Sequence, residues 1–106
     1  MNNPVGPVLR HGDDVDQIIA AIEDDNPDTD IEVTDRGAYI RVHAEDSLEL
    51  TEATLQEHLG ADYRIRSLEV AMSSFAGRVS TESDRIRWES AEAAKTRVTT
   101  TQGALS

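Results

Sequence analysis

The chain contains no cysteine, and this absence excludes disulfide bonds, thiolate metal sites and iron–sulfur clusters held by cysteine. Aromatic residues are also scarce, so Phe75, the only Phe, stands out. No apolar run approaches the roughly 20 residues of a membrane-spanning helix, and the N-terminus lacks the basic start and apolar stretch of a secretion signal. Together with a length of 106 residues, which suits one domain, these absences lead us to expect a cytoplasmic protein with one modest core.

Positive charge is scarce as well. The 21 Asp and Glu residues outnumber the ten basic residues, so the formal net charge is −11, and Lys95 is the only Lys. Phosphate backbones and anionic lipids require clustered Lys and Arg, so neither nucleic acid nor a membrane is an expected partner. Acidity of this kind supports solubility, and it also allows docking on a basic face of a partner protein.

The residues up to Gly12 predict an extended segment. Prolines at positions 4 and 7 disfavour both a helix and a central strand, so an edge strand is expected to begin only at Val8 and Leu9. Residues 1–7 are therefore expected to form a mobile arm, which is either a terminus without a binding role or a segment that becomes ordered on a partner.

The first helix is predicted to follow Asp14, which has the spacing of a capping box with Gln17. It should end near Asp25, because Asn26-Pro27 disfavours a continued helix. Its apolar stripe at helical spacing consists of Val15, Ile18, Ile19 and Ile22.

Residues 31–44 predict a β-hairpin. Apolar residues alternate with polar ones on both sides of the turn Asp35-Arg36-Gly37. Ile40 and Val42 should face the core, with Arg41 and His43 outward. A second helix should follow, with Thr51 as its N-cap and Gly60 as its C-terminal cap.

The stretch from Arg66 to Glu89 is expected to carry the last strands. Leu68, Val70 and Met72 alternate with polar or small residues, and Ile86 and Trp88 do the same. The small residues between them predict a loop around Phe75. That side chain is offered to a partner or folded back over its own hairpin.

The remaining residues, 90–106, are Thr-rich and predict a flexible tail, with a helical turn around Ala91–Lys95 at most. The expected structure is therefore a single α+β domain of element order β-α-β-β-α-β-β, folded over residues 1–89. We expect the free protein to be a monomer.

Motifs that carry chemistry are missing. His11, His43 and His58 have neither metal-ligand nor catalytic spacing, and no nucleophile elbow, phosphate loop or EF-hand loop is present. Two of the many carboxylates meeting in a cleft would give a small hydrolase, and this option stays open. The residues otherwise favour a binding module without a cofactor.

Five segments, in this order, resemble one family: the effector (coupling or regulatory) proteins of soluble diiron multicomponent monooxygenases. The segments are Asn3–Arg10 with Gly12-Asp13, Asp25–Pro27, Asp35–Arg41, Leu55–Gly60 and Ser74–Val79. The similarity covers about residues 3–89 and is greatest to the toluene and alkene (including isoprene) branch. The Thr-rich tail and Trp88 depart from the family pattern.

The resemblance implies a protein without metal, cofactor or catalysis of its own, which binds a diiron hydroxylase and alters its active site. Such systems also contain a reductase and, in the toluene type, a Rieske ferredoxin. We expect the partner interface in the N-terminal arm and the Phe75 loop. Its residues are Asn2, Asn3, Val5, Gly6, Pro7, Ser73, Ser74, Phe75, Ala76, Gly77 and Arg78.

An acidic inhibitor that mimics nucleic acid and blocks a basic protein surface is the alternative. It would show strong salt dependence against a nucleic-acid-binding partner. The apolar and glycine positions of the shared segments argue against this alternative.

Overall fold

The computed structural model describes residues 2–12 and 14–94. The strands and helices of this part follow one another as β1 (Pro4–Arg10), α1 (Val15–Asp25), β2 (Glu32–Asp35), β3 (Tyr39–Glu45), β4 (Ser47–Thr51), α2 (Glu52–Leu59), α3 (Ile65–Ala71), β5 (Met72–Ala76), β6 (Arg78–Thr81) and β7 (Arg85–Glu89).

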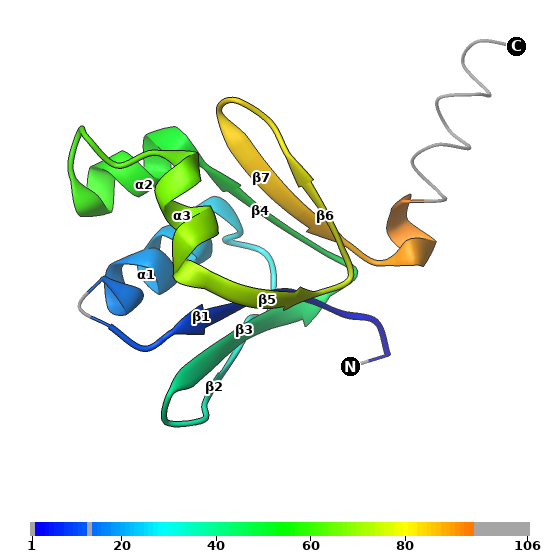
Figure 1. Ribbon diagram of the computed structural model, residues 1–106. Helices are drawn as coiled ribbons and strands as arrows, with labels where there is room; N and C mark the ends of the chain where they lie inside the picture. The colour runs from blue at the N-terminus through cyan, green and yellow to red at the C-terminus, as the bar shows by residue number, and fades with distance from the viewer. Residues whose placement is uncertain (1, 13, 95–106) are drawn as a thin grey trace, which may run out of the picture.

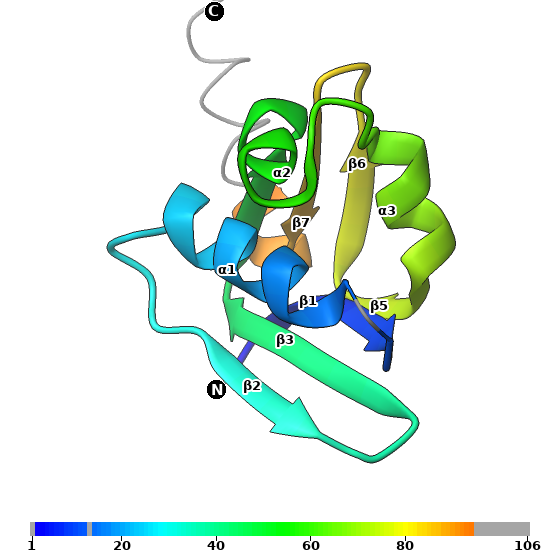
Figure 2. The same cartoon turned by 90° about the vertical axis from the view of Figure 1, so that its left-hand side faces the viewer.

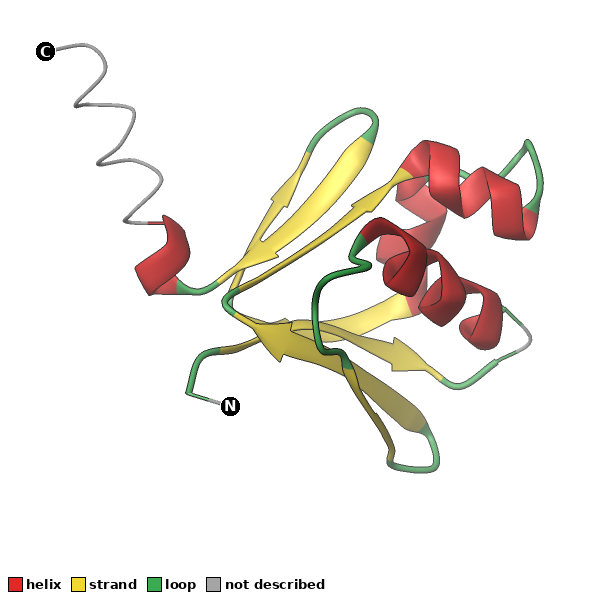
Figure 3. Ribbon diagram, turned by 180° about the vertical axis from the view of Figure 1, so that it is seen from behind, coloured by secondary structure: helices red, strands yellow, loops and turns green. Residues whose placement is uncertain are grey.

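The strands form two antiparallel sheets with the orders β2-β3-β1-β5 and β4-β7-β6. The sheets approach each other where β3 leads into β4 and β5 leads into β6, and the helices lie in the angle between them (Figures 1 and 3). Seen from the side, α1 lies over β3, and α2 lies above α1, farther from β3 (Figure 2). One face of the four-stranded sheet is thus covered, and none of the drawn helices lies over the other face.

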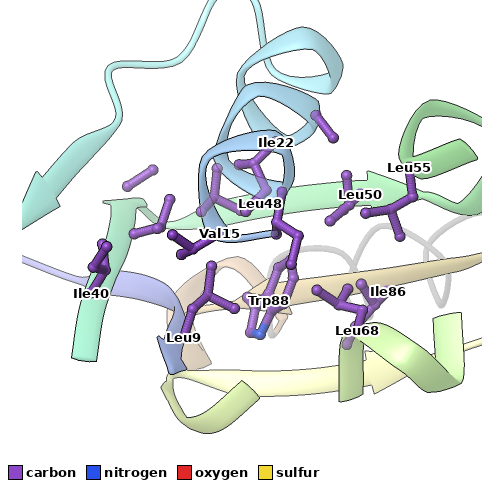
Figure 4. Packing of buried hydrophobic residues seen from close by; sticks show 14 of the residues in the cluster. Leu9, Val15, Ile22, Ile40, Leu48, Leu50, Leu55, Leu68, Ile86 and Trp88 are labelled. Carbon is purple, nitrogen blue, oxygen red and sulfur yellow. The ribbon is translucent and has the colours of Figure 1, made fainter. Parts of the chain in front are cut away.

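The hydrophobic core fills the angle between the sheets. Trp88, which is opposite Leu48 in the β4–β7 register, is fully buried near the middle of the apolar cluster (Figure 4). The other fully buried large apolar side chains include Leu9, Ile18, Ile22, Leu50, Leu55, Leu68 and Ile86. Every helix and both sheets contribute to this cluster, so one core holds the domain together.

The predicted α+β class is confirmed, and so is the predicted element order, with additions. A separate strand β4, the helix α3 and the hairpin strand β6 join the expected elements. The hairpin prediction is confirmed, with Ile40 and Val42 buried and Arg41 exposed, but His43, which was also predicted to face outward, is half-buried. The Thr51 side chain caps α2 by accepting a hydrogen bond from the backbone N–H of Thr54, and Gly60 ends that helix.

The strand predicted from Leu68, Val70 and Met72 is wrong, because this segment forms the helix α3 up to Ala71. Ile65 and Leu68, three residues apart, are buried on one side of α3, whereas Val70 is 71% exposed. Helical spacing therefore decides which side chains are buried. The loop predicted around Phe75 is also replaced, since Met72–Ala76 is the strand β5.

The mobile arm predicted for residues 1–7 is wrong from Pro4 onward. This segment belongs to β1, which is the central strand between β3 and β5 rather than an edge strand. The prolines are tolerated because Pro4 begins the strand, while the register with β3 passes from Val5 to Val8 without a pair for Gly6 or Pro7.

The predicted tail of residues 90–106 begins with an ordered turn. The backbone N–H of Ser90 donates to the Asp46 carbonyl oxygen, and the Ser90 hydroxyl accepts from the N–H of Ala93. Residues 91–94 form a helical turn in which Ala94 is buried. The rest of the predicted tail, 95–106, lies outside the described residues.

Side chains at the end of α1 tie this helix to the next elements. Asp25 accepts hydrogen bonds from the Thr51 N–H and from the hydroxyls of Thr51 and Thr54, at 2.6–3.1 Å. The Asn26 amide donates to the carbonyl oxygens of Ile22 and Glu49 and accepts from the Glu49 N–H. The Asp25 carboxylate at the C-terminal end of α1 thus joins this helix to the start of α2.

The capping box predicted at the N-terminal end of α1 is wrong, because the Asp14 side chain makes no capping hydrogen bond.

Among residues 2–12 and 14–94, none of the helices has the length and apolar character required to cross a membrane.

Candidate docking site

The two segments predicted as a partner interface are far apart in the sequence and lie side by side in the structure. Strands β1 and β5 pair antiparallel, with Gly6 opposite Ala76, Pro7 opposite Phe75 and Val8 opposite Ser74. The Ser73 hydroxyl adds a hydrogen bond to the Val8 carbonyl oxygen at 3.1 Å. Figure 1 shows β5 in front of β1, and β5 is one of the two edge strands of its sheet. We refer to residues 2–7 and 73–78 as the β1–β5 site.

The first residues of the site are held by acidic side chains. The Glu45 carboxylate accepts hydrogen bonds from the backbone N–H groups of Asn2 and Asn3, at 3.1 and 3.0 Å. The Asn3 side-chain amide donates to Asp46 Oδ1 at 3.2 Å. Asn2 is exposed and Asn3 half-buried, so both lie at the surface in fixed positions.

Val5, Gly6 and Pro7 are buried, so the structure does not present them at the surface as predicted. A Cβ atom added to Gly6 would lie 2.0 Å from the Val42 carbonyl oxygen, and Gly6 has φ +138°. Only glycine fits such a close backbone approach at a positive φ. These three residues therefore lie beneath the surface of the site and do not themselves form its accessible part.

Residues of β5 form the solvent-accessible part of the β1–β5 site. Phe75 is 44% exposed, and Ser74 is exposed beside it, whereas Ser73 and Ala76 are half-buried. Gly77, at φ +86°, makes the corner into β6, which begins with the exposed Arg78. A large apolar side chain left open among small polar residues suits a hydrophobic anchor at a protein interface.

A hollow that sequence reasoning missed adjoins the site. It has a volume of about 670 Å³ and is lined by residues from β1, β3, β5 and the β2–β3 turn, namely Val8, Arg36, Tyr39, Arg41, Ser73 and Ser74. The alternation in the hairpin predicted that Arg41 points outward. No local pattern joins it to β5, because sheet pairing alone brings these strands together.

His43 lies on β3 close to this region. Its Nε2 atom is buried and has no hydrogen-bond partner in the described part of the chain. Burial lowers the pKa of His43, the nearby positive charge of Arg41 lowers it further, and Glu32 opposes both effects. The neutral imidazole is thus favoured.

Metal ions in proteins are commonly held by His, Cys, Asp and Glu side chains. Within residues 2–12 and 14–94, no group of three such side chains is arranged to hold a metal ion.

Comparisons with known proteins agree with one another. Residues 3–89 match the model of the MmoB/DmpM family. The chain is 41% identical over 86 residues to the effector subunit of the alkene monooxygenase system of Xanthobacter autotrophicus, covering 81% of this chain and 85% of that protein.

Two kinds of solved structure are similar as well. A chain in a phenol hydroxylase–regulatory protein complex has a TM-score of 0.73 and 31% identity, covering 82% of this chain and 98% of the other. The soluble methane monooxygenase regulatory protein B has a TM-score of 0.64 and 25% identity, covering 82% of this chain and 64% of the other. The chain therefore belongs to the MmoB/DmpM family, and it is an effector protein of a multicomponent monooxygenase rather than a catalytic component.

Proposed function

We propose that this protein acts as a cytoplasmic monomer that binds the diiron hydroxylase of a hydrocarbon monooxygenase through the β1–β5 site. The system is expected to include a reductase and a Rieske ferredoxin as electron carriers. The observation that carries the proposal is the pairing of two distant segments around an exposed Phe75. It is supported by similarity to a chain in a phenol hydroxylase–regulatory protein complex and to an alkene monooxygenase effector.

The mechanism is a shift between hydroxylase conformations. An effector without a cofactor changes turnover only by binding one conformation of its partner more tightly than another. The β1–β5 site suits this task because its backbone is fixed by pairing on both sides of β1, so little ordering entropy opposes binding. Phe75 would enter an apolar pocket of the hydroxylase, and Asn2, Asn3 and Ser74 would form the polar rim.

The proposal is tested by titrating the hydroxylase and its electron-transfer proteins with this chain while product and NADH are followed together. We expect both the rate and the ratio of product formed to NADH consumed to rise and then saturate. Unchanged rate and ratio at every effector concentration, with all components active, would overturn the proposal.

The anchor role is tested with Phe75→Ala and a matched control, Val33→Ala. Both side chains are 44% exposed, but Val33 lies on β2, at the opposite edge of the same sheet. We expect Phe75→Ala to raise the concentration needed for half-maximal stimulation by about tenfold or more, as truncation of an interface anchor does. The Val33→Ala protein should behave like the parent. Equal effects of the two substitutions would remove Phe75 from the interface.

A further inference from the structure

The outer face of the β2-β3-β1-β5 sheet has an unusual charge for this protein. The helices and the second sheet all lie on the opposite side of that sheet (Figures 1 and 3). The exposed face contains the 670 Å³ hollow next to the β1–β5 site, and two of the residues that line it are the exposed arginines Arg36 and Arg41. A chain with a net charge of −11 thus has a cationic hollow beside its docking site.

Within residues 2–12 and 14–94, these two arginines have no acidic partner. Arg64, Arg85 and Arg87 each have a carboxylate oxygen within 3.7 Å. Arg36 and Arg41 have no carboxylate oxygen within 4.0 Å among the described residues. Acidic residues outnumber basic ones about two to one, so the chain has more than enough carboxylates to pair with every arginine. Their guanidinium groups are therefore available to carboxylates from outside.

The other residues of the hollow fit the same kind of ligand. Tyr39 is 47% exposed and lies opposite Arg10 in the β1–β3 register. The Ser74 hydroxyl forms no hydrogen bond with the described residues, so it is available as a donor. The positive charge of Arg41 extends along β3, where it helps to lower the pKa of His43. Guanidinium, hydroxyl and aromatic groups together match an acidic protein segment.

We propose that this hollow receives a carboxylate-bearing segment of the hydroxylase surface, with Arg36 and Arg41 pairing with its acidic side chains. This inference rests on the proposed function, and it assigns a sign to the partner's surface. An acidic hydroxylase surface repels this protein as a whole, because the net charge is −11, but attracts the part of the outer sheet face where Arg36 and Arg41 lie. Charge would thus orient the encounter and bring the β1–β5 site into register.

The test measures the Kd for the hydroxylase, over a range of NaCl concentrations, for Arg36→Gln/Arg41→Gln. The control is Arg64→Gln/Arg66→Gln, which removes the same charge from exposed residues of the α3 region. We expect the first variant to bind about tenfold or more weakly than the parent and with a shallower salt dependence. The control should keep the salt dependence of the parent. Unfolding by urea checks that both variants fold.

The sign of the partner surface is tested by comparing Arg41→Glu with Arg41→Gln. Opposite an acidic segment, Arg41→Glu binds more weakly than Arg41→Gln. Opposite a basic segment it binds more tightly, and that result would overturn the inference.

The remaining outcomes separate the inference from the proposed function. If the parent protein stimulates the hydroxylase while Arg36→Gln/Arg41→Gln binds as tightly as the parent, the inference fails and the function stands. Equal weakening by both double variants would mean a general effect of charge and would also overturn it. If sedimentation shows a dimer of the free protein that the Arg36→Gln/Arg41→Gln variant loses, the hollow receives a second copy instead. A parent protein that neither binds nor stimulates refutes the proposed function itself.

Discussion

Replacing Gly77 with alanine is expected to destabilise the fold by about 2–5 kcal/mol. Two separate costs contribute to this figure. A residue with a Cβ atom at the observed φ of +86° costs about 1–2 kcal/mol. The new Cβ would also lie 2.6 Å from Val5 Cγ1 and 2.8 Å from the Glu89 carbonyl oxygen, and such overpacking costs about 1–3 kcal/mol.

The chain offers a matched control for this substitution. Gly37 has nearly the same backbone conformation, with φ +85°, but nothing lies within 4 Å of an added Cβ atom. Gly37→Ala should therefore cost only the conformational term, about 1–2 kcal/mol. Alanine restricts the unfolded chain equally at both positions, so that effect cancels in the difference.

The assay is urea unfolding followed by the fluorescence of Trp88, which is the only Trp and is fully buried. The midpoint should fall further for Gly77→Ala than for Gly37→Ala, with similar slopes. Equal losses for the two variants would refute the reasoning, because the close approach of β1 and β7 to Gly77 would then contribute nothing. The same variant should bind the hydroxylase more weakly, since Gly77 makes the corner that positions β5.

Two further predictions concern stability. Asn26→Ala removes the amide that joins α1 to β4 and leaves both backbone groups of Glu49 without that partner, so we expect a loss of about 2–4 kcal/mol in the same urea assay; a loss below about 1 kcal/mol would contradict this. The pKa of His43 is lowered in the folded protein, so the unfolded chain takes up its proton first and stability falls as pH drops below 6.5 towards the folded pKa. His43→Gln should therefore flatten the decline in Tm between about pH 7 and 5, and an unchanged decline would show that His43 is not its source.

Local signals were sufficient where neighbouring residues decide the conformation. The apolar stripe of α1, the glycine turn of the hairpin and the Thr51 cap all depend on residues a few positions apart, and each was predicted. The helix α3 was not predicted, because the apolar spacing in a segment of seven residues is compatible with both a strand and a helix. A distant contact helps to decide between them: the Ile65 N–H, at the first turn of α3, donates to a carboxylate oxygen of Glu52 on α2. No pattern within residues 65–71 contains that partner.

The prediction for the N-terminal strand was wrong for a related reason. Pro4 and Pro7 would disfavour a central strand only if every position of the strand had to donate a hydrogen bond. In the structure β1 is central, but its register with β3 omits positions 6 and 7 and its register with β5 shifts between Val8 and Leu9. An irregular ladder accepts a proline and a glycine at positive φ, and only the paired strands reveal the irregularity.

Net charge alone does not predict which face of the protein docks, because a sum over the chain says nothing about where charges are neutralised. The charge of −11 suggested a basic partner face. In the folded chain, Arg85 and Arg87 are bound to Glu49 on the second sheet, whereas Arg36 and Arg41 stay unpaired by any described carboxylate beside the β1–β5 site. An excess of acid at the remaining surface then increases the contrast between that face and the rest of the molecule. A strongly acidic protein can in this way orient itself on an acidic partner, which is why the comparison of Arg41→Glu with Arg41→Gln carries more weight than any measurement of total charge.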